Sequence, residues 1–531
     1  MPETPPAETT TERLPLSGLR AIEVCDGIAG AFAGRWLALL GADVVKVEPP
    51  SGHPMRRAEP LFDGDRSVLF EILNAGKRSV TLDTDSAEGQ ERLRALLGRS
   101  DILVHDEAPT RAAFSYDALR AVDERLIVAA VRAFGEGEAY ADWKAADITA
   151  YGMGGMMYIT GSGDREPLKH GLTQAEFAAA EHAVIGVLVA LFERARSGAG
   201  QEVEATLLEA VAALIFVQTS QYSYTGEVLR RQPVGGGGFG SLQVVRTKDG
   251  YIAPVMGTGG AWSDLVELLG DDRLRDPELA SPGVRRTHAA RVDPVIAEAM
   301  QRKESEWLFR EAQRRRLAFG LCQDAAALLR CEQHEARGFY QSVEVGGRTL
   351  RIPGLPFRIG GRRGAPLSAA PAAGADNAVL DEPSAPPAAP PPPAGASRTG
   401  GALDGVRVLE AGMMYAAPMA ARILADYGAD VVKVESARRL DGIRSLGSPP
   451  DNELTPRFYD ECSRFNDSNR NKRGVALDIT TEEGRDLFLA LAAKSDVVIE
   501  NFTTGVVDRL GIGFEAVRAV NPRVVYVSTT G

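Results

Sequence analysis

The sequence predicts an α/β protein built on parallel β-sheets, and three observations support this class. A short apolar run, Leu19–Val24, and a β-branched run, Asp43–Glu48, lie on either side of a helix-like stretch, Gly30–Leu40. This order is typical of βαβ units, whose strands are parallel and buried on both faces. The same order returns late in the chain. We therefore expect a Rossmann-like parallel sheet and, after it, a second Rossmann-like lobe.

An internal repeat organises the chain. Residues 16–48 align without a gap on residues 403–435, and 17 of the 33 positions are identical. The match continues with NAGKRSVTLD (residues 74–83) on NRNKRGVALD (residues 469–478), and with SDILVHD on SDVVIEN. Two copies of one unit are therefore expected. Between them, residues 366–402 are rich in Pro, Ala and Gly, which is typical of a semi-extended linker.

Composition excludes several functions. The net charge of −12 argues against a nucleic-acid partner, because affinity for a polyanion comes mainly from Lys and Arg. Residues 1–13 are polar and Pro/Thr-rich, which predicts a disordered tail rather than a signal peptide, and no continuous apolar run is long enough for a bilayer. We expect a soluble, cytoplasmic protein that does not enter a membrane.

Neither a metal nor a bound nucleotide cofactor is expected. The four Cys and six His residues are scattered without the spacing of metal ligands. Gly27, Gly30 and Gly34 follow the first predicted strand, but their spacing differs from the GxGxxG that binds a dinucleotide pyrophosphate. The sequence therefore predicts no tightly bound cofactor.

Several motifs, in order, resemble those of the family III CoA-transferases, which include formyl-CoA and carnitine-CoA transferases and the related α-methylacyl-CoA racemases. They are LxGxRVLE with GADVVKVE, NxxKRxVxLD, DVVIENF, GMGGMMYITG and ALFERARSGAGQEVE. The resemblance implies that an enzyme carboxylate attacks an acyl-CoA thioester and that CoA then passes to a second carboxylic acid. Coenzyme A and acyl-CoA would be substrates, together with a carboxylic acid.

The resemblance also implies a domain layout. Residues 14–215 and 330–365 would form the large domain of the first copy, and residues 216–329 its smaller α+β domain, in which RTKDGYIAPV resembles a hairpin. Residues 403–531 would be a truncated second copy. Members of the family form interlocked dimers, so two fused copies would make an intramolecular pseudo-dimer or a homo-oligomer.

The resemblance points to Glu176 as the catalytic nucleophile, where the family has Asp. The functional group is the same, but the extra methylene moves the carboxylate by roughly 1 Å, which can cost about 100-fold in rate. Glu176 could equally be a polar remnant of a lost site. Lys144 falls where transferases place a Lys beside CoA, or it is a solvated surface residue. Ala146 replaces the His of racemases, which disfavours proton-transfer chemistry.

Further positions are implied for CoA and for the oxyanion. Gly235, Gly236, Gly237 and Gly238 would form a glycine loop whose N–H groups face an oxyanion, or a plain surface turn. Leu82 and Asp83 in the first copy, and Leu477 and Asp478 in the second, would lie at the adenine end of CoA, where an open parallel sheet has its crevice.

The two copies differ at the remaining CoA positions. The second copy keeps Asn501, Phe502 and Arg509, whereas the first has Asp106 and Glu107 in place of the ENF motif. Because carboxylates repel phosphate, we expect the first copy to be a structural and site-completing partner and the second to be the catalytic one.

Two alternatives remain open, a catalytically inert CoA-binding scaffold and an acyl-CoA racemase or lyase. Because the chain ends just before the segment that should carry the second nucleophile, we expect it to be a fragment of a longer protein.

Overall fold

The computed structural model describes residues 13–108, 110–137, 139–231, 244–255, 262–383 and 400–529. The chain divides into two compact units. The larger comprises Met1–Met156, Gly171–Leu229 and Ser342–Gly531, and the smaller comprises Met157–His170 and Arg230–Gln341. The smaller unit thus has two parts. Its second part begins at Arg230, later than the expected residue 216, because α9 (Phe216–Thr225) belongs to the larger unit, as does α8 (Leu207–Leu214) before it.

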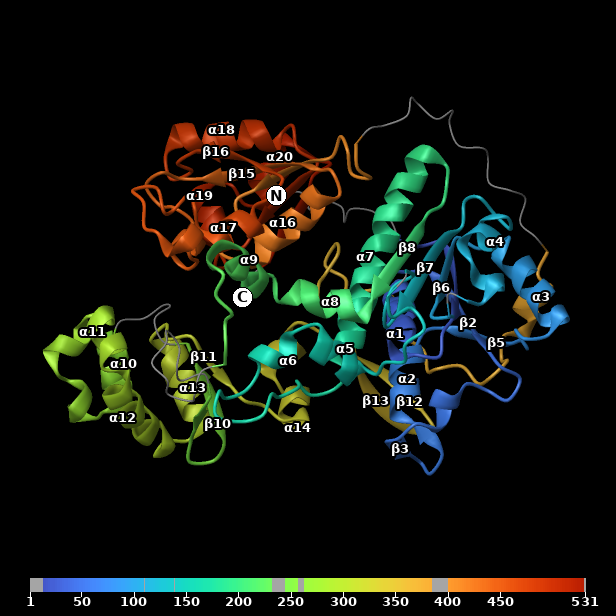
Figure 1. Cartoon of the computed structure of the whole chain (residues 1–531), viewed down its shortest axis with the longest axis horizontal. Coiled ribbons are helices and arrows are strands. Elements are labelled where there is room, and N and C mark those ends of the chain that lie inside the picture. The colour runs from blue at the N-terminus through green and yellow to red at the C-terminus, as the bar shows by residue number, and fades with distance from the viewer. Residues whose placement is uncertain are drawn as a thin grey trace, which may run out of the picture. The chain divides into compact units, whose positions relative to one another are not determined.

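The larger unit holds two separate parallel sheets (Figure 1). The six strands of the first sheet, in spatial order, are β5 (Arg78–Thr81), β2 (Asp43–Glu48), β1 (Arg20–Val24), β6 (Ile102–His105), β7 (Ile127–Arg132) and β8 (Glu202–Thr206). All neighbours pair in parallel. The α/β class predicted from the βαβ pattern is thereby confirmed.

Helices cover both faces of the first sheet. One face carries α1 (Ile28–Leu39) and α7 (Gln174–Ser197), which pack on each other and on the strands. The other face carries α3 (Ala87–Leu97) and α4 (Tyr116–Arg120), whose leucines join the strand side chains in one buried cluster. The remaining helices and hairpin strands of this region are β3 (Leu61–Phe62), β4 (Arg66–Ser67), α2 (Val68–Asn74), α5 (Asp147–Met153), α6 (Met156–Ile159), β12 (Tyr340–Val345) and β13 (Arg348–Pro353).

Helix α7 bears on the expectation that the protein does not enter a membrane. The helix has 24 residues and contains an 18-residue window of mean hydropathy 1.7, so by length and composition it could cross a bilayer. The helix nevertheless packs against α1, α8, β7 and β8, and its alanine-rich face is buried. It is a core helix of the first sheet, and its apolar character comes from that packing.

Residues 366–383 differ from the linker expected there. Instead of leaving the domain, they run along the outer edge of β5, where Asp376 N–H donates to Ser79 O at 2.8 Å. The short 3₁₀ helix η5 (Asn377–Asp381) then buries Val379 and Leu380 against the first sheet. The segment is held by hydrogen bonds from its backbone and from short side chains, which suits its small and polar residues.

The smaller unit is α+β, with one antiparallel sheet. Its strands are β9 (Val245–Arg246), β10 (Tyr251–Pro254) and β11 (Phe319–Leu321), and the expected hairpin is the β9–β10 pair. Its helices are α10 (Trp262–Leu269), α11 (Pro282–Thr287), α12 (Ala289–Gln301), α13 (Ser305–Arg314), α14 (Ala325–Leu329) and α15 (Glu332–Ala336). Leucines of α10 and α13 and Ile296 of α12 fill a core that includes Ile252.

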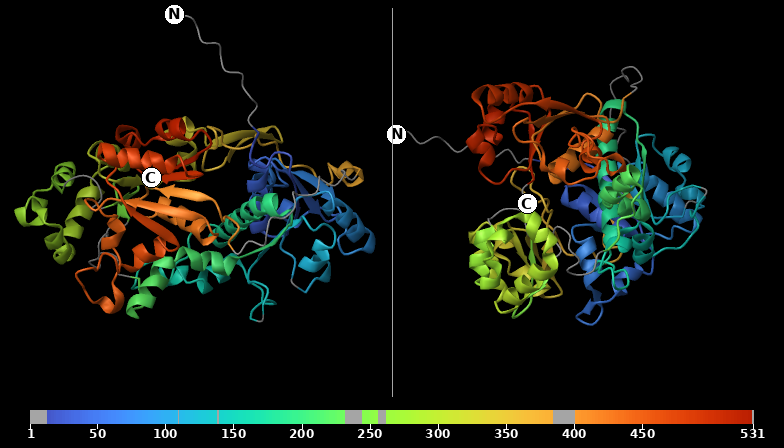
Figure 2. Two further views of the ribbon diagram at one scale, coloured as in Figure 1. Left: turned by 90° about the horizontal axis from the view of Figure 1, so that it is seen from above. Right: turned by 60° about the vertical axis from the view of Figure 1, so that its left-hand side comes forward.

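The second sheet repeats the strand order of the first. Its strands, in spatial order, are β16 (Lys472–Ala476), β15 (Asp430–Glu435), β14 (Arg407–Glu410), β17 (Val497–Glu500) and β18 (Val525–Ser528). They run side by side, in orange and red (Figure 2), and pair in parallel. Helix α16 (Ala416–Asp426) packs on one face, and α18 (Glu482–Ala492) and α20 (Phe514–Val520) on the other. Two shorter helices, α17 (Ser463–Ser468) and α19 (Val506–Leu510), complete it.

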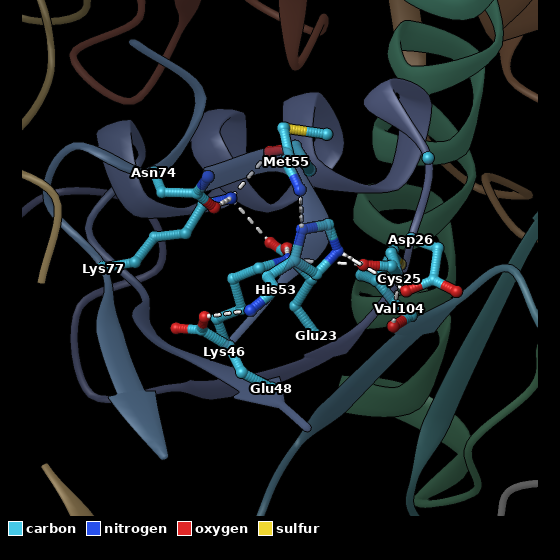
Figure 3. Close-up of polar contacts among 12 residues, drawn as sticks. Glu23, Cys25, Asp26, Lys46, Glu48, His53, Met55, Asn74, Lys77 and Val104 are labelled. Carbon is cyan, nitrogen blue, oxygen red and sulfur yellow. Dashed lines mark hydrogen bonds and ion pairs between the residues drawn. The ribbon is translucent and has the colours of Figure 1, made fainter. Parts of the chain in front are cut away.

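A buried ion cluster joins three elements of the first sheet (Figure 3). The Glu23 carboxylate on β1 accepts from Lys46 Nζ on β2 at 2.7 Å and from Lys77 Nζ at 2.6 Å. Lys77 also donates to Ala31 O of α1 at 2.8 Å. The three side chains are at most 1% exposed. Since a buried charge is tolerated only when it is paired, the cluster fixes how β1, β2, β5 and α1 meet.

The second sheet contains the same cluster at the aligned positions. Lys433 and Lys472 both donate to Glu410, at 3.1 and 2.7 Å, and Lys472 also donates to Pro418 O of α16 at 2.8 Å. In both clusters two ammonium groups share one carboxylate, and in the second Lys433 also pairs with the buried Asp441 at 3.2 Å. Burial accordingly lowers the pKa of Lys77 to about 8, only partly offset by Glu23, and lowers that of Lys472 likewise to about 8.

Removing the shared carboxylate should be costly. We expect Glu23→Gln to lower the free energy of unfolding of the first sheet by about 3–5 kcal/mol, because it leaves two buried ammonium groups without their counter-ion. Denaturant unfolding followed by circular dichroism measures the loss. The control is Glu306→Gln, at a pair with Arg310 in which both side chains are about half exposed, where we expect less than about 1 kcal/mol. Equal losses in the two variants would contradict the structural role of Glu23.

Candidate active site

A crevice opens at the carboxyl ends of the first sheet's strands. It has a volume of about 200 Å³ and lies after β1, β2, β5 and β6, the place where open parallel sheets bind ligands. The structure brings the expected residues Leu82 and Asp83 together here. The other lining residues are Val24, Cys25, Asp26, Val47, Glu48, Pro49, Thr84, Asp85, Asp106, Glu107 and Arg111.

The lining of this crevice is strongly acidic. Its one cation, Arg111, already binds Glu107 at 2.5 Å, Asp85 at 2.6 Å and Thr84 O at 3.0 Å. The guanidinium group is therefore committed to neighbouring carboxylates. A phosphate entering the crevice would meet several carboxylates and no uncommitted cation, so this site disfavours a polyanionic ligand.

Asp106 approaches the start of α1 from the end of β6. Its carboxylate accepts from Asp26 N–H at 2.9 Å and from Gly27 N–H at 2.6 Å. Gly27 permits this approach, because a Cβ atom there would lie 3.1 Å from Asp106 Oδ2. Burial raises the pKa of Asp106 to about 6, although the two N–H groups oppose the shift.

Glu176 reaches the same helix start from the first turn of α7. Its Oε2 accepts from Ala29 N–H at 2.9 Å, and Ile28 N–H also donates to this carboxylate. The first N–H groups of a helix carry partial positive charge and stabilise an anion. Burial raises the pKa of Glu176, and the neighbouring Asp147 and Asp106 carboxylates raise it further, against the pull of the two N–H groups.

Asp147 sets the position of Glu176. Its Oδ1 accepts from Ala175 N–H at 2.8 Å and from Glu176 N–H at 3.3 Å, so it caps the start of α7. Sequence reasoning placed neither this cap nor Asp106 beside Glu176, since the residues come from distant parts of the chain. The signal available was the pattern of acidic residues directly after β6 and before α5.

The second sheet has a different residue at the aligned helix start. Asn501 Oδ1 accepts from Met413 N–H, and Asn501 Nδ2 donates to Met413 O, both at 2.8 Å. Phe502 packs into the core beside Phe488, and its N–H donates to Glu500. In the second sheet the two amides therefore have different acceptors, since Asn501 binds Met413 N–H and the Asp441 carboxylate binds the next one, Met414 N–H, at 2.9 Å.

The remaining expected site residues are dispersed. Arg509 is exposed on α19, and Lys144 is exposed before α5. Leu477 packs into the core of the second sheet, while Asp478 accepts from Thr480 N–H at 3.1 Å. Gly235, Gly236, Gly237 and Gly238 lie outside the described residues. Within the described ranges, no cluster of three His, Cys, Asp or Glu side chains could hold a metal ion.

Comparison with known proteins identifies the family. The profile of CoA-transferase family III matches residues 16–377 and 403–531. The chain belongs to this family. A probable CoA-transferase of Mycobacterium tuberculosis is 30% identical over 522 residues, which cover 96% of this chain and 64% of the relative. This chain therefore spans slightly less than two thirds of that relative's length.

Two further family members are similar over shorter regions. The succinate–glutarate CoA-transferase of Agrobacterium fabrum is 30% identical over 352 residues, which cover 64% of this chain and 88% of the relative. The crystal structure of a CAIB/BAIF family protein from Brucella suis matches with a TM-score of 0.64 and 27% identity, covering 70% of this chain and 99% of that one. The two parallel sheets thus belong to a fold seen in this CoA-transferase family.

The raised pKa of Asp106 leads to a pH-dependent prediction. A free carboxyl group titrates near pH 4, so the folded protein holds the Asp106 proton more tightly than the unfolded chain does. Stability is therefore lost as the pH rises from about 4 through about 6. We expect Asp106→Asn, which introduces the amide found at the aligned position Asn501, to raise the melting temperature at pH 7.5. This gain should fade toward pH 4.5.

Thermal unfolding at these two pH values checks the effect. The control, Asp486→Asn, changes a carboxylate that is 66% exposed on α18, and it should show no such pH dependence. A melting temperature for Asp106→Asn below that of the unchanged protein at pH 7.5 would contradict the burial argument.

Proposed function

We propose that this protein moves coenzyme A from an acyl-CoA to a carboxylic acid through an enzyme carboxylate, Glu176. One observation carries the proposal, the Glu176 carboxylate bound to the first N–H groups of α1 beside the crevice. The family resemblance implies a nucleophile at this position, and partial burial with a raised pKa makes a carboxylate more nucleophilic than an exposed one.

The proposed reaction proceeds by exchange at acyl carbons. Glu176 attacks the thioester carbonyl carbon, the C–S bond breaks, and a mixed anhydride and CoA thiolate form. The thiolate then attacks the Glu176 carbonyl carbon, which releases the donor carboxylate and leaves a glutamyl-CoA thioester. The acceptor carboxylate attacks the carbonyl carbon of this thioester and expels the CoA thiolate, which leaves an anhydride between Glu176 and the acceptor. The thiolate then attacks the acceptor's acyl carbon, which forms the product acyl-CoA and releases the Glu176 carboxylate. Ala29 N–H and Ile28 N–H would stabilise the oxyanion that forms on Glu176 in the two steps where its own carbonyl carbon is attacked.

We also propose that the two sheets are copies of one unit with divided roles. The second sheet, with neutral Asn501 and exposed Arg509, suits the phosphates of CoA better than the acid-lined first crevice does. Within the larger unit, α9 packs against α17, Gln221 Nε2 donates to Ser448 Oγ at 2.8 Å, and Asn466 Nδ2 donates to Tyr224 OH at 3.1 Å. These contacts support an intramolecular pseudo-dimer.

A second candidate function is a CoA-binding scaffold without transfer activity. It is favoured by the extra methylene of Glu176 and by the carboxylates that line the first crevice. A racemase or lyase is less well supported, since Ala146 supplies no proton-transfer group.

Trapping the covalent intermediate tests the role of Glu176. We expect incubation with a panel of short-chain acyl-CoA esters that includes succinyl-CoA, followed by hydroxylamine, to leave a hydroxamate on Glu176, detected by peptide mass spectrometry. Glu176→Gln should abolish the mark and lower the transfer rate by at least about 100-fold. Glu181→Gln, an exposed glutamate on the same helix, is the control and should retain both. Absence of any mark with every donor would favour the scaffold.

Calorimetry on the full chain tests which sheet holds CoA. We expect Arg509→Ala to weaken CoA binding by about tenfold, the loss of one charge-assisted phosphate contact. Arg111→Ala, at the first crevice, should change it by less than about twofold, since Arg111 is bound to Glu107 and Asp85. The opposite ranking of the two variants would assign CoA to the first sheet.

A further inference from the structure

The two sheets differ at one outer edge, and this difference identifies a binding surface. In the first sheet, residues 367–382 lie along β5. Ser79 N–H donates to Asp376 Oδ2 at 2.9 Å, Thr81 N–H donates to Asn377 Oδ1 at 2.8 Å, and Asp376 N–H returns a bond to Ser79 O. The segment thus satisfies the outward N–H groups of Ser79 and Thr81 and the carbonyl oxygen of Ser79, and Ser79 is fully buried.

Side chains hold the same segment at both ends. Arg56, which also binds Glu48, donates to Pro371 O at 2.8 Å. Farther along, Val379 and Leu380 enter the core beside Leu93 of α3, and Glu382 accepts from Arg20 at 2.9 Å. The segment therefore supplies short acceptors, then an aliphatic pair, then a carboxylate.

At the equivalent edge of the second sheet, the described part of the chain supplies no such segment. Gly474 and Ala476 of β16 align with Ser79 and Thr81, pair with β15 in the same register, and are exposed. Among the described residues, none bonds to the outer side of either one. Beside this edge lies a cavity of about 380 Å³, whose lining includes Glu435, Arg444 and Phe465, the counterparts of Glu48, Arg56 and Phe70.

Most residues that contact this segment in the first sheet have counterparts of similar chemistry in the second sheet. Arg407 and Arg473 occupy the places of Arg20 and Arg78, the two cations that bind Glu382 in the first sheet. Phe488 and Leu477 stand where Leu93 and Leu82 receive the aliphatic pair. One position differs, because Leu487, 51% exposed on α18, replaces the Arg92 that binds Asp381.

We propose that the β16 edge and its cavity bind an extended peptide segment from outside residues 1–531, with the chemistry of residues 367–382. The segment adds to the sheet edge through Gly474 and Ala476, places short Asp or Asn acceptors against them, inserts an aliphatic pair beside Phe488, and ends on a glutamate at Arg473. An apolar residue replaces Asp381 over Leu487. Such edge addition gives affinity through the backbone and specificity through side-chain pockets, and it covers an edge that would otherwise invite aggregation.

The test uses the full chain and a synthetic peptide of residues 367–382, LSAAPAAGADNAVLDE. We expect saturable binding of one peptide per chain in calorimetry. Hydrogen exchange should slow in β16 and stay unchanged in β18, the opposite edge of the same sheet. A peptide with Ala in place of both Asp376 and Asn377 should bind at least about tenfold more weakly, since two backbone partners are lost.

Three protein variants sharpen the test. Gly474→Pro removes an outward N–H group and should abolish binding, and Arg473→Glu should weaken it about tenfold by facing the peptide's glutamate. Leu487→Arg, on an exposed site where a folding defect is not expected, should strengthen binding by about two- to fivefold by restoring the partner of Asp381. That gain should vanish for a peptide in which Asp381 is Ala.

Three outcomes would overturn the proposal. The first is no saturable binding at about 1 mM peptide, the weak end of specific affinity. The second is binding that is insensitive to Gly474→Pro and Leu487→Arg. The third is a concentration-dependent dimer in light scattering that Gly474→Pro removes, which would assign the edge to a second copy of this chain.

Discussion

The buried Glu23 carboxylate, shared by Lys46 and Lys77, is the interaction on which the first sheet depends. This ion cluster joins β1 to its neighbour β2, to the turn before β5, and to the backbone carbonyl oxygen of Ala31 in α1. Because one carboxylate must neutralise two ammonium groups without water, none of these elements can shift alone. Lys433 and Lys472 share Glu410 in the same way, so both parallel sheets are held together by this kind of ion cluster.

Fixing α1 against the strands also fixes the site. The N–H groups at the start of α1 bind the Glu176 carboxylate, and the side chain that comes from the end of β6 contributes to their electrostatic surroundings. In the first sheet that side chain is the Asp106 carboxylate, whose pKa burial raises to about 6 and whose charge also raises the pKa of Glu176. In the second sheet it is Asn501, which makes the same backbone contact without charge. The two sheets therefore place different side chains, from the end of this strand, against the aligned helix start.

The sequence predicted what depends on local pattern and on repetition. The βαβ order, the parallel sheets and the β9–β10 hairpin follow from runs of apolar and β-branched residues. Leu82 and Asp83, which the family resemblance singled out, line the crevice, and their contact with CoA stays a prediction. Composition was a poor guide at residues 366–383, where Ala, Pro and Gly suggested a linker. The contacts that order this segment join Ser79 to Asp376, 297 residues apart, and no local pattern reports them. The meeting of Asp106, Asp147 and Glu176 was missed for the same reason.

That long-range closure of β5 has a consequence for how the protein is made. On the ribosome, the strands of the first sheet and the whole of the smaller unit emerge before residues 367–382 do. Throughout that interval β5 lacks the segment that covers its outer edge. Its outward N–H and C=O groups can therefore pair with a strand of another chain. The first sheet therefore reaches its final, sealed state only after the smaller unit has been synthesised, and the nascent chain is most vulnerable to mispairing at Ser79 and Thr81 until then.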